Sequence, residues 1–175
     1  MPRTITLSLL LLCIGWSVSH QLSAQNILNA NFEQWSPSGQ APPFDWEFPT
    51  DWTSNNATTE FITRVVTRVS PAIDSNNSAH LRTITIFGGT VPAVLVNGTT
   101  GVNYPNYTPI LKDAGTPFTN DLYGVSGYYM YTAGGPGDSA VVEVWTKSWN
   151  NLSLQADTIA YGKIKLGPTV HALPF

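Results

Sequence analysis

The fold class depends most on residues 123–147, YGVSGYYMYTAGGPGDSAVVEVWTK. Two runs rich in Val, Tyr and Trp, 123–132 and 139–147, flank the glycine-dense segment 133–138. Runs of this composition on either side of a glycine-rich turn are typical of paired antiparallel strands. The sequence therefore predicts that 123–132 and 139–147 form a β-hairpin.

Side chains within the second run of this hairpin alternate in character. Successive residues of a strand point to opposite faces of the sheet. Ala140, Val142 and Val144 share one face in this scheme, and Trp145 lies on the other face between Glu143 and Lys147. We therefore expect Trp145 on the polar, outward side of the sheet.

Short runs of the same kind recur along the chain after residue 25, and none of them keeps an apolar period of 3.6 residues. The sequence predicts further strands at 27–33, 59–69, 79–87, 91–96, 108–111 and 156–166. Four prolines between residues 35 and 52 argue against a central strand there, because proline cannot donate a ladder hydrogen bond. The predicted fold class is all-β.

Residues 59–69 show the clearest alternation outside the hairpin. Phe61, Val65 and Val69 fall on one face, together with Thr63 and Thr67, and the opposite face carries Glu60, Arg64 and Arg68. Two packed sheets bury the side chains on their inner faces. We therefore expect the face with Phe61 and Val69 to be buried.

Composition limits the classes of function. The 175 residues carry 8 Lys+Arg against 11 Asp+Glu, which gives a net charge of −3, and only 11% of them are charged. This length fits a single domain with a leader. Binding to nucleic acid needs concentrated positive charge, and the sequence has no Lys/Arg cluster, so nucleic acid is not an expected partner.

The first 25 residues have the pattern of a secretory signal peptide. Arg3 precedes an apolar run at 5–18, which is shorter than the ~20 residues of a membrane-spanning helix, and small and polar residues follow it. We expect cleavage after Ala24 or Gln25, although a retained anchor is the alternative. Cleavage leaves a domain at 26–175 without cysteine and without a membrane segment, because Cys13 is the only cysteine. The protein is expected outside the cell, secreted or at the cell surface.

Three groups of residues resemble one family. The mature chain opens with Asn29-Ala30-Asn31-Phe32-Glu33-Gln34-Trp35 and continues to Pro49-Thr50-Asp51-Trp52. Ser78-Ala79-His80-Leu81-Arg82-Thr83 follows, and then Gly115-Thr116-Pro117-Phe118, Gly127-Tyr128-Tyr129-Met130-Tyr131 and Asp138-Ser139-Ala140. This pattern resembles the PCMD carbohydrate-metabolism domain and related galactose-binding-like modules of secreted bacterial proteins.

The resemblance implies a jelly-roll-type antiparallel β-sandwich, exported by a bacterial type IX pathway. Such proteins often carry a C-terminal sorting domain, and they have closing strands after the one that matches 156–166. The chain ends at Leu173-Pro174-Phe175 without either. We therefore expect 26–175 to be an incomplete sandwich, a fragment truncated at its C-terminal strands. The oligomeric state stays open.

Aromatic residues in loops and on polar faces indicate a carbohydrate ligand, because a flat ring stacks on the apolar face of a sugar. Trp46, between Asp45 and Glu47, and Trp145 are the first candidates, followed by Tyr104 and Tyr107 in the long loop at 97–119. The alternative is that these aromatic residues belong to the core, where such side chains bury large areas.

Calcium is the single metal for which a site can be named. In carbohydrate-binding jelly rolls similar to this chain, an acidic residue at the position of Glu33 helps to hold a structural calcium ion. Asp138 in the glycine-rich turn is a second candidate ligand, since calcium takes carboxylate oxygens. The alternative for Glu33 is an exposed carboxylate at the end of a strand. No other cofactor is expected.

Catalytic motifs do not occur in the sequence. It has no H-E-x-x-H pair, no nucleophile elbow and no phosphate-binding loop. The leading hypothesis is therefore a non-catalytic module that binds carbohydrate. A structural or adhesion module of the cell surface, with its aromatic residues uniformly buried, is the alternative. A glycan hydrolase is less favoured because it needs two convergent carboxylates.

Overall fold

The computed structural model describes residues 27–59, 61–73, 75–99, 101–103, 108–109, 114–119, 122 and 124–175. Within these residues the protein is all-β, as predicted, and its one helix is the single turn α1 (Asn56–Thr59). No helix in the described part of the chain is long and apolar enough to cross a bilayer. The predicted signal peptide, 1–25, lies outside the described residues.

The described strands pair two by two, and every pair is antiparallel. The pairs are β1 (Trp35–Pro37) with β2 (Glu47–Pro49), β3 (Trp52–Ser54) with β8 (Leu95–Asn97), β4 (Val66–Val69) with β5 (Ser78–Leu81), β6 (Ile84–Ile86) with β7 (Gly89–Val91), β9 (Val102–Asn103) with β10 (Thr108–Pro109), β11 (Tyr128–Tyr129) with β14 (Leu173–Pro174), and β12 (Ala140–Asn150) with β13 (Gln155–Leu166).

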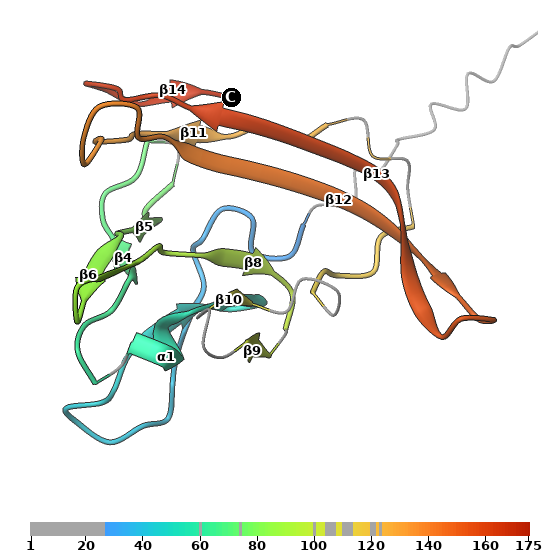
Figure 1. Ribbon diagram of the computed structural model, residues 1–175, viewed down its shortest axis with the longest axis horizontal. Helices are drawn as coiled ribbons and strands as arrows, with labels where there is room; N and C mark the ends of the chain where they lie inside the picture. The colour runs from blue at the N-terminus through green and yellow to red at the C-terminus, as the bar shows by residue number, and fades with distance from the viewer. Residues whose placement is uncertain are drawn as a thin grey trace, which may run out of the picture.

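The longest pair, β12 with β13, forms a ribbon that runs across the molecule above β4, β5, β6 and β8 (Figure 1). Val142 faces Ile164 and Trp145 faces Tyr161 across the ribbon. The turn at its end is closed by the side chain of Asn150, whose Oδ1 accepts hydrogen bonds from the N–H groups of Leu152 (2.9 Å) and Ser153 (3.3 Å). This side-chain acceptor explains why the chain reverses there.

The predicted hairpin of 123–132 with 139–147 is wrong. Tyr128 and Tyr129 pair instead with the C-terminal strand β14, and residues 140–150 pair with β13. The glycine-rich segment does turn, since Gly134 N–H donates to Asp138 Oδ2 at 2.9 Å, but the strands on either side of it separate. The predicted strand at 156–166 is confirmed as β13, and its eleven residue pairs with β12 outweigh the local turn signal.

The buried centre of the described chain mixes apolar and polar side chains. Val65, Val66, Val91 and Leu166 are its buried aliphatic residues. Four polar residues are also buried, at most 4% exposed: Ser54, Asn55, Asn56 and Thr59. Polar groups in such a place need hydrogen-bond partners, because an unpaired one costs free energy.

Asn55 and Asn56 find these partners in the backbone. Asn56 Oδ1 accepts from the N–H groups of Val65 and Val66, both at 2.9 Å, and Asn56 Nδ2 donates to the carbonyl of Val66 at 2.7 Å. Asn55 Nδ2 donates to the carbonyl of Pro92 at 2.8 Å, and its Oδ1 accepts from Val94 N–H at 3.0 Å. The two amides therefore join α1 and the residue before it to the start of β4 and to the segment before β8.

Those contacts explain why the predicted strand at 59–69 is mostly wrong. The side chain of Asn56 occupies backbone groups of Val65 and Val66, so the strand begins only at Val66. Phe61 lies in a turn, is 75% exposed and packs edge-on against Phe44, with ring centroids 5.1 Å apart. Val69 is also exposed. Of the apolar residues expected on the buried face, Val65 alone is buried.

The predicted strand at 27–33 is wrong as well. Asn29 and Phe32 have φ angles of 47° and 55°, which an extended strand does not allow. The side chain of Asn29 stabilises the turns by bonding the main chain of Gln34 and the carbonyl of Thr50. Two indole N–H groups also bond this segment. That of Trp35 donates to the carbonyl of Phe32 at 2.6 Å, and that of Trp52 donates to the carbonyl of Leu28 at 3.1 Å.

The remaining predicted strands are partly confirmed. Residues 79–87 form two strands, β5 and β6, with a break after Leu81, and residues 91–96 are divided between the end of β7 and most of β8. Of the weak strand at 108–111, the described residues 108–109 form β10. The prolines between 35 and 52 allow the short hairpin β1–β2, in which Pro37 and Pro49 are strand ends.

Candidate functional site

Two adjoining depressions lie on the side of the molecule formed by β2, β4 and β5. The first, the basic depression, has a volume of about 290 Å³ and is lined by Thr63, Arg64, Thr67, His80 and Arg82. The second, the tryptophan depression, has about 260 Å³ and is lined by Trp46, Glu47, Arg64, Val66, Thr67 and Arg68. Both are near the lower end of the ~300–1,000 Å³ that is usual for small-molecule sites.

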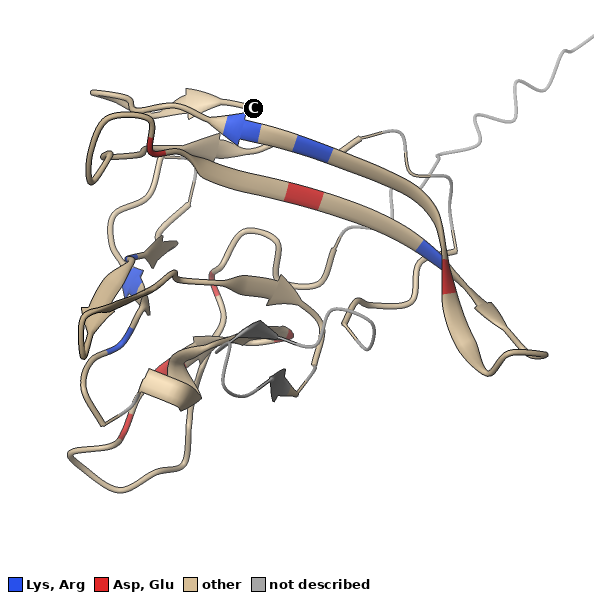
Figure 2. Ribbon diagram, in the orientation of Figure 1, with Lys and Arg blue, Asp and Glu red and all other residues tan. Residues whose placement is uncertain are grey.

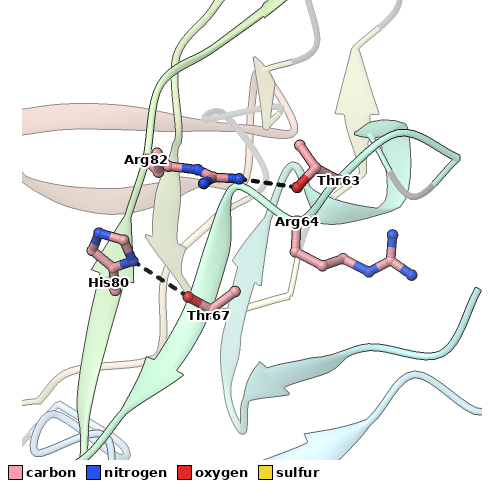
Figure 3. A pocket seen from close by; sticks show the side chains of 5 residues that line it. All are labelled: Thr63, Arg64, Thr67, His80 and Arg82. Atoms are coloured by element: carbon pink, nitrogen blue, oxygen red, sulfur yellow. Dashed lines mark hydrogen bonds between the residues drawn. The ribbon is translucent and has the colours of Figure 1, made fainter. Parts of the chain in front are cut away.

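Pairing of β4 with β5 builds the basic depression. Thr67 lies directly opposite His80 in the register, so both side chains emerge on one face. Thr67 Oγ1 and His80 Nδ1 are 3.5 Å apart. Arg82 follows β5, and its guanidinium reaches toward the chain before β4, where Nη2 donates to Thr63 Oγ1 at 3.0 Å (Figure 3). Hydroxyl, imidazole and guanidinium groups therefore surround one hollow.

Trp46 enters the second depression from the end of the β1–β2 hairpin. Its main chain is fixed by Ser38, whose N–H donates to the carbonyl of Trp46 at 2.7 Å and whose Oγ accepts from Trp46 N–H at 3.2 Å. Its ring lies against Phe48, with centroids 5.6 Å apart. Glu47 and Arg68 form an ion pair at 3.0 Å beside it. The tryptophan ring and two charged groups thus line the same hollow.

Arg64 belongs to both depressions and holds the loop that leads to Trp46. Its Nη2 donates to the carbonyls of Asp45 (3.0 Å) and Pro43 (3.4 Å). In Figure 3 its guanidinium points away from Arg82 and His80. Arg64 is therefore a positioning residue for the 43–46 loop.

The arginines of the described chain all lie in this region, whereas its lysines lie on the ribbon (Figure 2). Arg68 is compensated by Glu47. Arg82 forms no ion pair with a carboxylate in the described residues, and no Asp or Glu lines the basic depression. The hollow is locally positive although the chain has a net charge of −3.

Trp145 is placed on the ribbon and lines neither depression. Its ring stands 5.5 Å from that of Tyr161, centroid to centroid. The Tyr161 hydroxyl donates to Glu143 Oε1 at 2.9 Å, and Lys163 Nζ lies 2.7 Å from the same oxygen. The Lys163 ammonium, and then the Tyr161 hydroxyl, lower the pKa of Glu143. Trp145 is therefore part of a row of cross-strand contacts on the same face as Glu143, as predicted, but it is half-buried and burial does not alternate along this part of β12.

Glu33 connects two distant loops. Its Oε1 accepts from the N–H groups of Asn76 (2.6 Å) and Asn77 (2.9 Å), and its Oε2 accepts from the side-chain amides of the same two residues. The backbone N–H of Asn77 is the largest cause of a lowered pKa of Glu33. The carboxylate thus has a structural role at the 75–77 turn.

Asp138 closes the glycine-rich turn. It accepts from the N–H groups of Gly134 and Ser139, each at 2.9 Å, and from the Tyr131 hydroxyl. The Tyr131 hydroxyl is the first cause of its lowered pKa, and the same bond raises the pKa of Tyr131 to about 12. No group of three or more His, Cys, Asp or Glu side chains gathers among the described residues. Calcium at Glu33 and Asp138 stays a prediction.

Tyr104 and Tyr107 lie outside the described residues. His80 and Arg82 were not predicted as site residues, although both lie in the predicted strand at 79–87. The signal that was available is the turn cluster at 71–77, which joins β4 to β5. Had the two strands been paired around that turn, Thr67 and His80 would have been placed on one face.

Comparison of the sequence with protein-family models gives no match, and comparisons with curated proteins and with solved structures give none either. The resemblance to the PCMD domain therefore rests on the motifs quoted above and stays a prediction.

Proposed function

We propose that this protein is a non-catalytic carbohydrate-binding module whose site is the tryptophan depression. The observation that carries the proposal is that Trp46 lines one hollow with the Glu47–Arg68 ion pair and Thr67. An aromatic ring offers a flat apolar surface, and the surrounding polar groups offer donors and acceptors. Saccharides need both, because a sugar ring has apolar C–H faces and hydroxyl edges.

The geometry gives less support to a glycan hydrolase. Glycosidases commonly use two carboxyl groups about 5–10 Å apart. Glu47 is the one carboxylic acid that lines either depression, and it is paired with Arg68. A binding role needs no second carboxylate.

The module is proposed to be an exported jelly-roll β-sandwich. Support for the architecture comes from the antiparallel pairing of all described strands and from the ribbon that lies over β4, β5, β6 and β8 (Figure 1). Support for export comes from residues 1–25, in which a charged residue, an apolar run and then small and polar residues follow one another. Secretion or display at the cell surface gives such a module access to polysaccharide.

Calorimetry on the chain from Asn26 onward, with a panel of soluble oligosaccharides, tests the proposal. Trp46→Ala is expected to weaken saccharide affinity about tenfold or more, because the variant lacks the aromatic contact with the sugar. Trp149→Ala is the matched control, because Trp149 is 61% exposed at the far end of the ribbon. Circular dichroism establishes that both variants fold. Unchanged affinity in folded Trp46→Ala would exclude this site.

A second candidate function, a structural module that assembles at the cell surface, is favoured by the ribbon. Every residue of β13 from Gln155 to Lys165 is exposed, and among the described strands β13 pairs with β12 alone. A long unpaired strand edge is a template for another chain. Concentration-dependent sedimentation that is abolished by Ile164→Lys, but not by Val170→Lys, would support this candidate. A monomer at every concentration would exclude it.

A further inference from the structure

We propose that the basic depression binds an acidic group on the saccharide, a carboxylate or a sulfate ester. This inference rests on the proposed function, because it adds a charged subsite to the tryptophan depression. The two hollows share Arg64 and Thr67 and are therefore contiguous. The occupant is an acidic oligosaccharide of at least two rings: one ring stacks on Trp46, and its neighbour presents the anion to Arg82.

Arg82 is the residue that recognises the anion. Its main chain is held in place, since its N–H donates to the carbonyl of Val65 at 2.8 Å. Its Nη2 donates to Thr63 Oγ1 at 3.0 Å, which fixes the direction of the guanidinium (Figure 3). A guanidinium has five N–H donors in a planar fork that matches two oxygens of a carboxylate or sulfate. With no carboxylate partner in the described chain, this fork is oriented but not neutralised.

Neighbouring groups suit the same ligand. His80 adds ring nitrogens, and Thr63 and Thr67 add hydroxyls that hydrogen-bond sugar oxygens. An acidic residue in the lining would repel an anion, and the lining has none. The other two arginines of the described residues already have structural tasks, because Arg68 pairs with Glu47 and Arg64 holds the loop before Trp46. Acid recognition therefore depends mainly on Arg82.

The test compares matched saccharides on the chain from Asn26 onward. Calorimetry is done with an oligogalacturonate, with a sulfated galactan oligosaccharide and with a neutral galacto-oligosaccharide of the same length. Either acidic probe is expected to bind about tenfold more tightly than the neutral one at low salt, the gain of one charge-assisted contact. Comparing the two acidic probes distinguishes a carboxylate ligand from a sulfate ligand.

Variants identify the residue. Arg82→Gln is expected to remove the acid preference, so that the acidic and the neutral probes bind the variant with similar affinity. Lys165→Gln, which removes an exposed cation from the ribbon, is the control and is expected to keep the preference. An acid preference that survives in folded Arg82→Gln would overturn the proposal. Salt gives a measurement that needs no variant: acidic binding should weaken as ionic strength rises, because exposed charges are screened, and neutral binding should not.

Each failure has its own result. If no probe binds the folded chain, the proposed function fails and takes the acidic subsite with it. If the neutral probe binds as tightly as both acidic probes, the proposed function stands and the acidic subsite is overturned. If acidic binding is insensitive to salt, the contact is not ionic and the role of Arg82 is likewise overturned.

Discussion

Asn56 and Val66 are joined by two hydrogen bonds in the way that two strands are joined. Asn56 Oδ1 accepts from Val66 N–H at 2.9 Å and Asn56 Nδ2 donates to the carbonyl of Val66 at 2.7 Å, and both residues are at most 1% exposed. A side-chain amide carries the same donor and acceptor as a peptide group. It therefore replaces a neighbouring strand at the point where β4 enters the buried centre.

Replacing Asn56 by Ala should be among the most destabilising single changes in the chain. Three buried backbone groups, the N–H groups of Val65 and Val66 and the carbonyl of Val66, lose their partner. We expect a loss of about 3–5 kcal/mol in the free energy of unfolding, measured by urea denaturation. Asn151→Ala, in the exposed ribbon turn, should change it by less than about 0.5 kcal/mol. Equal denaturation midpoints for the two variants would contradict this account.

Glu33→Gln should destabilise the protein at neutral pH and much less in acid. Hydrogen bonds to the ionised carboxylate, led by that of Asn77 N–H, hold the pKa of Glu33 below its ordinary value of 4.5. A lowered folded-state pKa gives stability that is fully present above the unfolded pKa and is lost as pH falls through the folded one. The difference in melting temperature between wild type and Glu33→Gln should therefore shrink as the pH falls below about 4.5.

Asp45→Asn is the control for that series, since it removes the same charge from an exposed loop residue. The difference in melting temperature between wild type and Asp45→Asn should not show the pH dependence expected for Glu33→Gln. A Glu33→Gln difference that is constant with pH would show that the hydrogen bonds do not depend on the ionised carboxylate.

Trp145→Ala should loosen the ribbon without affecting saccharide binding. The Trp145–Tyr161 pair is a cross-strand contact, and aromatic pairs contribute about 0.5–1.5 kcal/mol beyond the area they bury. Faster hydrogen exchange at the amides of β12 and β13 would report the loss. Tyr161→Phe keeps the ring contact and removes only the hydroxyl bond to Glu143, so exchange should rise less. Loss of saccharide affinity in folded Trp145→Ala would move the binding site to the ribbon.

Gly98→Ala should be worse tolerated than Gly88→Ala. Both glycines have positive φ angles, +87° and +80°, so both substitutions carry a conformational cost of about 1–2 kcal/mol. A Cβ at Gly98 would also collide with the backbone of Gly115, whereas a Cβ at Gly88 would meet open space. We expect Gly98→Ala to lower the free energy of unfolding by about 1–3 kcal/mol more than Gly88→Ala, measured by thermal or urea denaturation. This difference reports the close contact between the segments of Gly98 and Gly115. Equal losses would mean that the segments separate at no cost.

Local sequence patterns predicted which segments form strands better than they predicted which strands pair. The strand at 156–166 was predicted because its Thr, Ile and Tyr residues favour a strand locally. Its partner was not, because the glycines at 134, 135 and 137 are a strong local turn signal, while the Asn150 side-chain turn is a weak one. Which strands pair depends on contacts along the whole length of both strands. No short stretch of sequence therefore predicts the partner of a strand.

Among the candidate site residues too, those marked by local sequence were predicted and those that depend on strand pairing were not. Trp46 was identified because an aromatic residue between two acids in a loop is visible in sequence. Arg82 and His80 became site residues only through the register of β4 with β5 and through the reach of a long side chain to Thr63. Phe61 was assigned to the core by alternation alone, and the side chain of Asn56 overrides that pattern by occupying the backbone of Val65 and Val66.

The polar share of the buried centre also determines how the protein responds to temperature. Exposure of apolar surface on unfolding raises the heat capacity, and exposure of polar surface lowers it. Here Asn55, Asn56, Ser54 and Thr59 become exposed along with the few buried aliphatic side chains. The heat-capacity change should therefore be small for a chain of this length, so the stability curve is broad and shallow. Cooling and warming around the optimum change the folded population less than they do in a domain with an aliphatic core.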